Sequence, residues 1–282
     1  MLPILFKIGE FSFSSLGLSL ALAFLVCFFI IWRRLREANL NEEKIVDAFL
    51  FSVIGAIIMS RAFYILLSWP TFKFNLIKWL YFNYFPGFTF TGALVGFLLS
   101  FYFFSRRQKW NFYKVADELI FGLLPFAMVT ELGIFLDGSD LGAETGMPWG
   151  LFFPGDMVRR HPVSLFKSLL FLSLWVYFLR IERIWRSWNW YRSHKEGFIL
   201  INFVIFTSVF KLALAFLKPI GLYSVLVEKV GSLSLLVMGI IWLYMRSGRD
   251  ISEDLGFTKK ISILKDRFKN RKENIHGKNK GS

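Results

Sequence analysis

Four charged side chains stand inside long apolar stretches of the sequence and are the first candidates for chemistry. They are Arg61, Glu131, Lys167 and Lys211. A charge within a membrane-length apolar stretch is costly, so each is a functional-site hypothesis by default. Arginine grips a phosphate through two parallel hydrogen bonds, and lysine attracts it as a point charge. The cations could therefore hold a lipid phosphate. The alternative is that the four charges pair with one another and fix helix packing.

A polar stretch between Thr130 and Lys167 collects acids, glycines and prolines directly after an apolar segment. It holds His161, one of three histidines in the chain, immediately before Pro162. Because histidine exchanges protons near neutral pH, His161 is the candidate general base. A single histidine beside a proline is equally well explained as an anchor of the loop, so both interpretations stay open.

The elements that carry these residues are predicted to be membrane helices. Apolar residues make up 55% of the 282 residues, and phenylalanine alone occurs 35 times. Apolar runs of about 20 residues with few charges are typical of helices that cross a bilayer. The runs are too long for barrel strands and do not alternate with period two. We therefore predict an all-α polytopic membrane protein.

Seven spans are predicted from the apolar runs. They cover Phe13–Trp32, Ile45–Trp69, Phe88–Phe104, Val115–Leu136, Val163–Leu179, Gly197–Leu217 and Ser224–Met245. Lysine and arginine are concentrated after the first, third and fifth spans and in the C-terminal tail. Since basic loops stay in the cytoplasm, the N-terminus is predicted to lie outside and the C-terminus in the cytoplasm. An odd number of spans requires the two termini to lie on opposite sides, so the count agrees with the charge pattern.

Residues 1–245 are predicted to form one membrane domain, and 246–282 a basic cytoplasmic tail. Within the tail, Lys259–Lys272 is either a short helix on anionic headgroups or part of a disordered segment. The net charge of +14 is explained by basic loops, so the membrane and not nucleic acid is the expected partner.

The single cysteine, Cys27, excludes an intrachain disulfide and a thiolate metal cluster. The first apolar run lacks a small-residue cleavage site and is expected to be retained. No cofactor or metal is expected.

Five other charges lie within one or two turns of a predicted span end, where an interfacial role is favoured. They are Asp47, Asp117, Glu118, Glu228 and Lys229. The four charges named first all fall toward the outer end of their spans. They could therefore face one cavity in the outer leaflet.

Four segments make the chain resemble the prolipoprotein diacylglyceryl transferases, over roughly Phe13 to Tyr244. They are Ser15–Gly17, Ser60–Tyr64, Gly87–Gly92, and the loop from Leu132 through Pro148-Trp149 with its His161-Pro-x-x-Leu-aromatic continuation. The resemblance implies seven spans in a bacterial inner membrane. It also implies transfer of the diacylglyceryl group of phosphatidylglycerol to the cysteine thiol of a lipoprotein precursor.

The resemblance also carries substrate-binding roles onto this chain, with altered side chains. The family's functional histidine falls on Thr91, and the second asparagine of its signature loop falls on Asp137. Two arginines of the sixth span fall on Lys211 and Lys218, while Gly142 of the loop is kept. Lysine retains the charge of arginine but loses its planar fork, and threonine cannot act as a base at neutral pH.

Two further positions exchange the sign of their charge. The resemblance implies a cation at position 131 and an anion at position 167, whereas this chain has Glu131 and Lys167. We predict that the two form an ion pair between the fourth and fifth spans. Glu131 would otherwise repel a phosphate. Three functional hypotheses therefore stay open: a divergent transferase, a relative that binds phospholipid or lipoprotein without transfer, and a small-solute transporter. No internal repeat or pair of Gly/Pro-broken helices supports the last.

Overall fold

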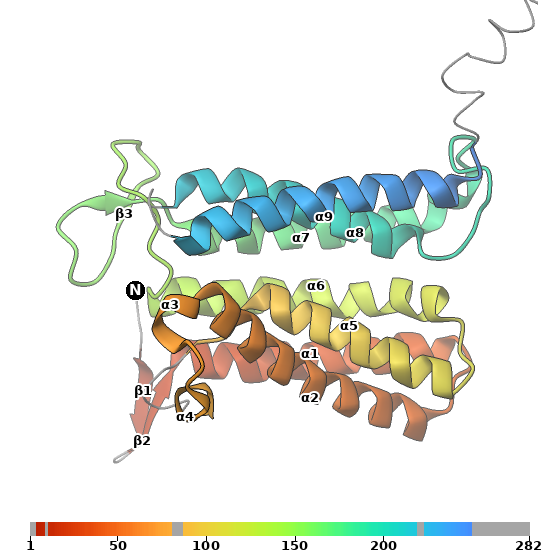
Figure 1. Cartoon of the computed structure of the whole chain (residues 1–282), viewed down its shortest axis with the longest axis horizontal. Coiled ribbons are helices and arrows are strands. Elements are labelled where there is room, and N and C mark those ends of the chain that lie inside the picture. Colours follow the sequence, from red (N-terminus) through yellow and green to blue (C-terminus); the bar gives the residue numbers. More distant parts are fainter. Residues whose placement is uncertain (1–3, 9–10, 81–86, 219–222, 250–282) are drawn as a thin grey trace, which may run out of the picture.

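The computed structural model describes residues 4–8, 11–80, 87–218 and 223–249. Within them, long helices run side by side (Figure 1). These helices are α1 Ser15–Glu37, α2 Glu42–Leu67, α5 Phe90–Arg107, α6 Phe112–Asp137, α7 Val163–Ile184, α8 Phe198–Leu214 and α9 Tyr223–Ser247. Each coincides with a predicted span to within a few residues, so the predicted helices are confirmed. The predicted Lys259–Lys272 helix lies outside the described residues.

The described chain is that of a multi-pass membrane protein. Six of its helices are long and apolar enough to cross a bilayer: α1, α2, α6, α7 extended by the 3-10 turn Trp185–Ser187, α8 extended by the 3-10 turn η2 Ala215–Leu217, and Lys229–Ser247 of α9. The remaining long helix, α5, has 18 residues and ends in Arg106 and Arg107, which reduce its apolar character.

Several helices continue past the predicted ends on the basic side. Helix α1 runs to Glu37, α5 to Arg107 and α7 to Ile184. The predicted ends were placed where the apolar runs of the sequence end, at the edge of the hydrocarbon layer of the bilayer. Backbone hydrogen bonding does not stop there, and the Arg33–Glu37 ion pair of 3.0 Å supports the additional turn of α1.

Short elements that the sequence analysis missed gather at the opposite end, on the left in Figure 1. Two small antiparallel sheets pair β1 Ile4–Ile8 with β2 Phe11–Ser14 and β3 Leu151–Phe152 with β4 Arg159–Arg160. The short helices α3 Trp69–Phe72 and α4 Leu76–Leu80 follow α2. Elements of two to five residues are too short for apolar periodicity to reveal them.

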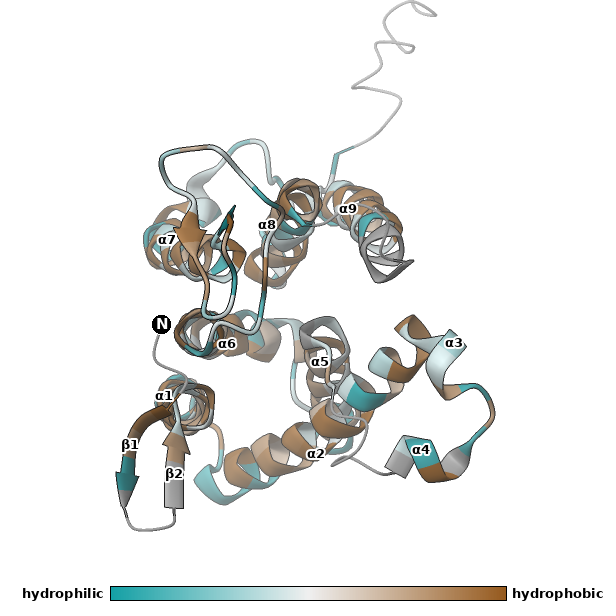
Figure 2. Cartoon of the chain, turned by 90° about the vertical axis from the view of Figure 1, so that its left-hand side faces the viewer, coloured by the Kyte–Doolittle hydropathy of each residue, from teal (hydrophilic) through white to brown (hydrophobic). Residues whose placement is uncertain are grey.

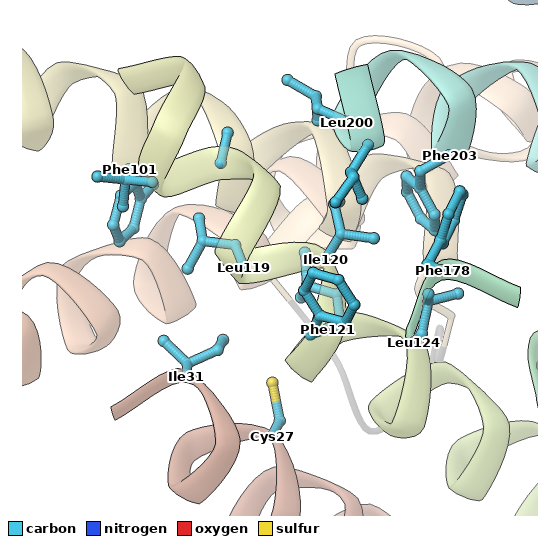
Figure 3. Close-up of a cluster of buried hydrophobic side chains, with 14 of the residues drawn as sticks. Cys27, Ile31, Phe101, Leu119, Ile120, Phe121, Leu124, Phe178, Leu200 and Phe203 are labelled. Carbon is cyan, nitrogen blue, oxygen red and sulfur yellow. The ribbon is translucent and has the colours of Figure 1, made fainter. Parts of the chain in front are cut away.

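Helix α6 is the centre of the bundle. Of its apolar stretch, 56% is buried, against 17–44% in the other candidate spans. Viewed end-on, α6 lies between α1 and the α7–α8 pair (Figure 2). Leu119, Ile120, Phe121 and Leu124 of α6 are in one buried cluster with side chains from α1, α2, α5, α7 and α8, part of which is drawn in Figure 3. A helix that is apolar all round is expected to be buried in this way.

Helix α5 is held against α2 by small residues. A Cβ atom on Gly96 of α5 would lie 2.3 Å from the carbonyl oxygen of Gly55 on α2. Small residues at such contacts let membrane helices approach closely. The N-terminal turn of α5, which carries Thr91, is therefore fixed relative to α2.

Charges at the basic end have structural partners. Arg34 of α1 bonds to Glu118 of α6 at 2.7 Å and Glu182 of α7 at 2.9 Å, and its guanidinium lies 3.6 Å from the Phe121 ring centroid. Asp117 accepts hydrogen bonds from two backbone N–H groups at the start of α8. Asp117 and Glu118 thus stabilise the packing near helix ends.

Candidate functional site

The end of α6 and the start of α7 face each other across a loop of residues 138–162. Helix α6 ends at Asp137, which is partly buried, and Gly138 follows in the left-handed conformation with φ +80°. The Gly138 N–H donates to the carbonyl of Ile134 at 3.0 Å. This turn directs the chain into the loop and brings Glu131 opposite the first turns of α7.

A charge cluster occupies this junction. The Lys167 ammonium lies 3.5 Å from the carboxylate of Glu131 and 2.7 Å from that of Asp140. Ser164 of α7 also donates to Asp140, at 2.9 Å. The predicted Glu131–Lys167 ion pair is confirmed. Asp140 is nevertheless the nearer partner of Lys167, and the sequence analysis did not place it there.

The lysines keep Asp140 ionised. Burial by itself raises the pKa of Asp140. The charge of Lys167, its hydrogen bond, the charge of Lys218 and the Ser164 hydrogen bond act in the opposite direction and together hold that pKa below its ordinary value. Lys218, at the end of η2, is therefore part of the electrostatic surroundings of this cluster.

His161 lies in the loop, packed against Gly142. The backbone N–H of His161 donates to the carbonyl of Ala143 at 3.1 Å. The backbone N–H of Ala143 donates to the carbonyl of Leu217 at 2.7 Å, which connects the loop to η2. A Cβ atom on Gly142 would lie 2.3 Å from the His161 carbonyl oxygen, so the close approach requires glycine. The buried Nδ1 of His161 has no hydrogen-bond partner among the described residues.

Thr91 and Lys211 meet between α5 and α8. The Lys211 ammonium of α8 donates to the hydroxyl of Thr91 in the first turn of α5. The resemblance implied a substrate-binding role for each of these positions, and the structure places them in contact. An ammonium beside a hydroxyl can hold an anionic oxygen between two donors.

Arg61 is buried, with 6% of its surface exposed, and it binds the chain itself. Its guanidinium donates to the carbonyls of Trp79 at 3.1 Å, Gly87 at 3.1 Å and Lys78 at 3.3 Å. It also lines a cavity of about 460 Å³ whose other walls are apolar. These walls are Ile57, Ile58, Ala62, Ile65, Leu66, Trp69 and Trp79. The cavity has the character of a site for an acyl chain.

Arg160 organises the loop, and the sequence analysis did not single it out. Its guanidinium bonds to Asp156, to Glu144 at 3.2 Å and to the carbonyl of Gly142 at 3.3 Å. Only the four-residue spacing of Asp156 and Arg160 could have suggested a partner, and such spacing carries little information in a loop. Arg160 therefore supports the segment that holds Gly142 beside His161.

Six of the nine predicted site residues thus form three groups, which lie in the C-terminal parts of α2, α6 and α8 and at the starts of α5 and α7. The first joins Glu131 and Lys167 with Asp140 and lies near Lys218; the second joins Thr91 and Lys211; the third is Arg61 with its carbonyls. Their part in binding a substrate stays a prediction. Among the described residues, no three His, Cys, Asp or Glu side chains form a group that could hold a metal ion.

Comparison with known proteins gives one consistent family. The family model described as prolipoprotein diacylglyceryl transferase matches residues 3–245. A phosphatidylglycerol–prolipoprotein diacylglyceryl transferase of Pseudoalteromonas atlantica is 31% identical over 62% of this chain and 65% of its own length. The protein of the same name from Geobacter sulfurreducens is 28% identical over 77% of this chain and 82% of its own length. A second such transferase of Clostridium perfringens is 25% identical over 80% and 88%.

Proposed function

Since the chain belongs to the prolipoprotein diacylglyceryl transferase family, we propose that it transfers the diacylglyceryl group of phosphatidylglycerol to the cysteine thiol of a lipoprotein precursor. The observation that carries this proposal is the family match over residues 3–245, which includes helices α1 to α8, most of α9 and the loop with His161. The substrates are a membrane phospholipid and a secreted precursor, and the protein acts in a bacterial plasma membrane.

The proposed topology has seven spans, with the N-terminus outside and the C-terminus in the cytoplasm. Helix α5 supplies the seventh crossing, since it packs along α2 through Gly55 and Gly96. The asymmetry of basic residues supports the orientation. In this arrangement residues 1–245 form the membrane domain and the basic segment 246–282 lies in the cytoplasm. The three groups of site residues then lie at the outer leaflet.

The reaction makes one bond and breaks another at a single glycerol carbon. The thiolate sulfur of the acceptor cysteine attacks the carbon that carries the phosphate ester, forming a C–S bond. The C–O bond breaks, and glycerol phosphate leaves with the electron pair. The thiol must first lose its proton, because the thiolate is the nucleophile. The enzyme must also stabilise the charge on the departing phosphate.

His161 and the partly buried lysines are suited to these two tasks. His161 accepts the thiol proton, and its unpartnered Nδ1 supports this role. Lys211 with the Thr91 hydroxyl, together with Lys218, binds the phosphate. Lys167 neutralises Glu131 and so reduces the repulsion that this carboxylate would exert on the phosphate. Asp137 and Gly142 shape the loop that holds His161.

The function is tested by transfer in membranes. We expect the chain to restore growth to a strain depleted of its own family enzyme, and to attach labelled diacylglyceryl to a precursor cysteine. His161→Ala should lower the transfer rate by about 10²-fold or more, because positioned general bases contribute rate factors of roughly 10²–10⁴. His194→Ala is the matched control, since that exposed histidine lies between α7 and α8 at the basic end. It should keep full activity.

A well-folded protein that transfers nothing would contradict the proposed function. Mass spectrometry of co-purified lipid would then decide whether the chain is a relative that binds phospholipid without transferring it. Equal activity of the His161→Ala and His194→Ala proteins would assign His161 to loop structure alone.

A further inference from the structure

We propose that Ser60 and Arg61 form a clamp on the chain segment before α5, and that this clamp positions Thr91 against Lys211. The inference rests on the proposed function, because it assigns positioning residues to the same site. Ser60 and Arg61 are adjacent on α2 and both are buried. They act on Thr91 through Gly87 and Thr89, which precede it.

The Ser60 hydroxyl bonds to both backbone polar groups of Thr89. The Ser60 hydroxyl donates to the Thr89 carbonyl at 2.9 Å and accepts from the Thr89 N–H at 2.9 Å. The Thr89 hydroxyl donates to the Ser60 carbonyl at 3.3 Å. Thr89 is the N-cap residue of α5, and its hydroxyl also accepts from the Gly92 N–H at 3.2 Å. Ser60 therefore fixes the residue at which α5 begins.

Arg61 bonds to α4 and to Gly87, which lies three residues before the start of α5. It donates to the carbonyls of Lys78 and Trp79 in α4, and to the carbonyl of Gly87 two residues before Thr89. Its guanidinium lies 5.7 Å and 5.3 Å from the ring centroids of Tyr64 and Phe72. A buried guanidinium is costly unless its donors are used, and here they join α4 and the start of α5 to α2.

The clamp leaves little freedom at the start of α5. A Cβ atom on Gly92 would lie 2.6 Å from the Met59 carbonyl oxygen, so this turn rests directly on α2. Thr91 lies between Thr89 and Gly92, and Lys211 reaches it from α8. The position of the Thr91 hydroxyl is thus set from α2, while that of the ammonium is set from α8. Misplacing a catalytic contact by about 1 Å can cost roughly 10²-fold in rate.

The first test measures transfer kinetics. Ser60→Ala should lower kcat about tenfold with KM for phosphatidylglycerol little changed, because the substrate still binds but the phosphate donors are misplaced. Ser60→Thr, which keeps the hydroxyl, should recover most of the loss. Arg61→Lys should resemble Ser60→Ala, because one ammonium cannot reach three separated carbonyls. Ser52→Ala is the matched control, since the buried Ser52 hydroxyl donates within α2 itself, to the Ala48 carbonyl at 2.6 Å.

The second test does not depend on activity. Thr91→Cys and Lys211→Cys are introduced together, with Cys27→Ala, and joined by a short bifunctional thiol reagent. Adding Ser60→Ala should lower the crosslinking yield severalfold, whereas adding Ser52→Ala should leave it unchanged. If Ser60→Ala fails to fold, Arg61→Lys is measured in its place.

The two tests separate the two proposals. A wild-type chain that transfers nothing would overturn the proposed function, and crosslinking would still decide the clamp. An active wild-type chain whose transfer and crosslinking are both unaffected by Ser60→Ala and Arg61→Lys would overturn the clamp alone.

Discussion

Lys167 is shared by two carboxylates, and this determines the charge of the site. Its ammonium lies 2.7 Å from Asp140 and 3.5 Å from Glu131, and Lys218 adds a second positive charge nearby. Two acids are thus balanced by two lysines. The net charge of this cluster is therefore close to zero, so it does not repel an approaching phosphate as Glu131 alone would. The family resemblance implies a cation at position 131.

Reversing the pair tests this balance at the level of single residues. Lys167→Glu would place three carboxylates together and should lower the free energy of unfolding by roughly 3–5 kcal/mol, as expected for breaking a buried pair. Glu131→Lys/Lys167→Glu should recover only part of the loss, because Asp140 would then face a glutamate. Adding Asp140→Asn should recover more. Denaturant unfolding in detergent measures each value.

A surface pair provides the comparison for these variants. Arg33 and Glu37 are also ion-paired, but their side chains are 67% and 63% exposed. Arg33→Glu/Glu37→Arg should change the free energy of unfolding by no more than about 0.5 kcal/mol. If the single effects at positions 131 and 167 simply add in the double variant, the two residues are not coupled.

At the scale of elements, Asp117 joins the start of α8 to α6. Its carboxylate accepts from the N–H groups of Gly197 at 2.7 Å and Leu200 at 2.8 Å. The first N–H groups of a helix have no partner within the helix. An acidic side chain there accepts their hydrogen bonds and interacts favourably with the positive end of the helix dipole. The bond connects α6 to the N-cap residue of α8, Gly197, which lies 80 residues later in the chain.

Removing this cap should loosen α8. We expect Asp117→Ala to lower the free energy of unfolding by about 2 kcal/mol, because buried N–H groups lose their acceptor. Asp117→Asn should cost less, since the amide oxygen still accepts. Hydrogen exchange at the Leu200 amide should accelerate in the alanine variant. Asp47→Ala, at an exposed acid near the start of α2, is the control. Equal effects at positions 47 and 117 would rule out the cap.

At the scale of the whole molecule, the proposed topology assigns each loop to one side of the membrane. Cys27 is buried, so introduced cysteines can be labelled selectively. Met157→Cys, at a residue 96% exposed in the outer loop, should react with a membrane-impermeant maleimide in intact cells. Asn189→Cys, between α7 and α8, should react only after the membrane is opened. The reverse result would invert the topology.

The same labelling decides whether α5 crosses the membrane. Phe74→Cys, at a residue 86% exposed before α5, should be labelled from outside, and Asn111→Cys after α5 only from inside. Labelling of both from the same side would leave α5 as a helix that does not span.

The sequence by itself determined which segments are helices and where the charges enter them. Apolarity over membrane length is a local property, because lipid requires each segment to satisfy its own backbone. The Glu131–Lys167 pair was also accessible, because the family resemblance implies the opposite charge at each of these two positions. The cap formed by Asp117 was not accessible, since its acceptor role depends on a helix far along the chain.

The tertiary structure alone decided the other partners at the site. Asp140 lies in a loop, and its approach to Lys167 depends on the path that Gly138 and Gly142 allow the backbone to take. Arg61 was predicted to grip phosphate, but the fold places three carbonyls around it. In the sequence, Ser60 is one residue of a motif with no identified partner, and the fold brings its hydroxyl into hydrogen-bond contact with Thr89. Hydrogen bonds act over about 3 Å, so they depend on the exact backbone positions of segments that sequence order does not bring together.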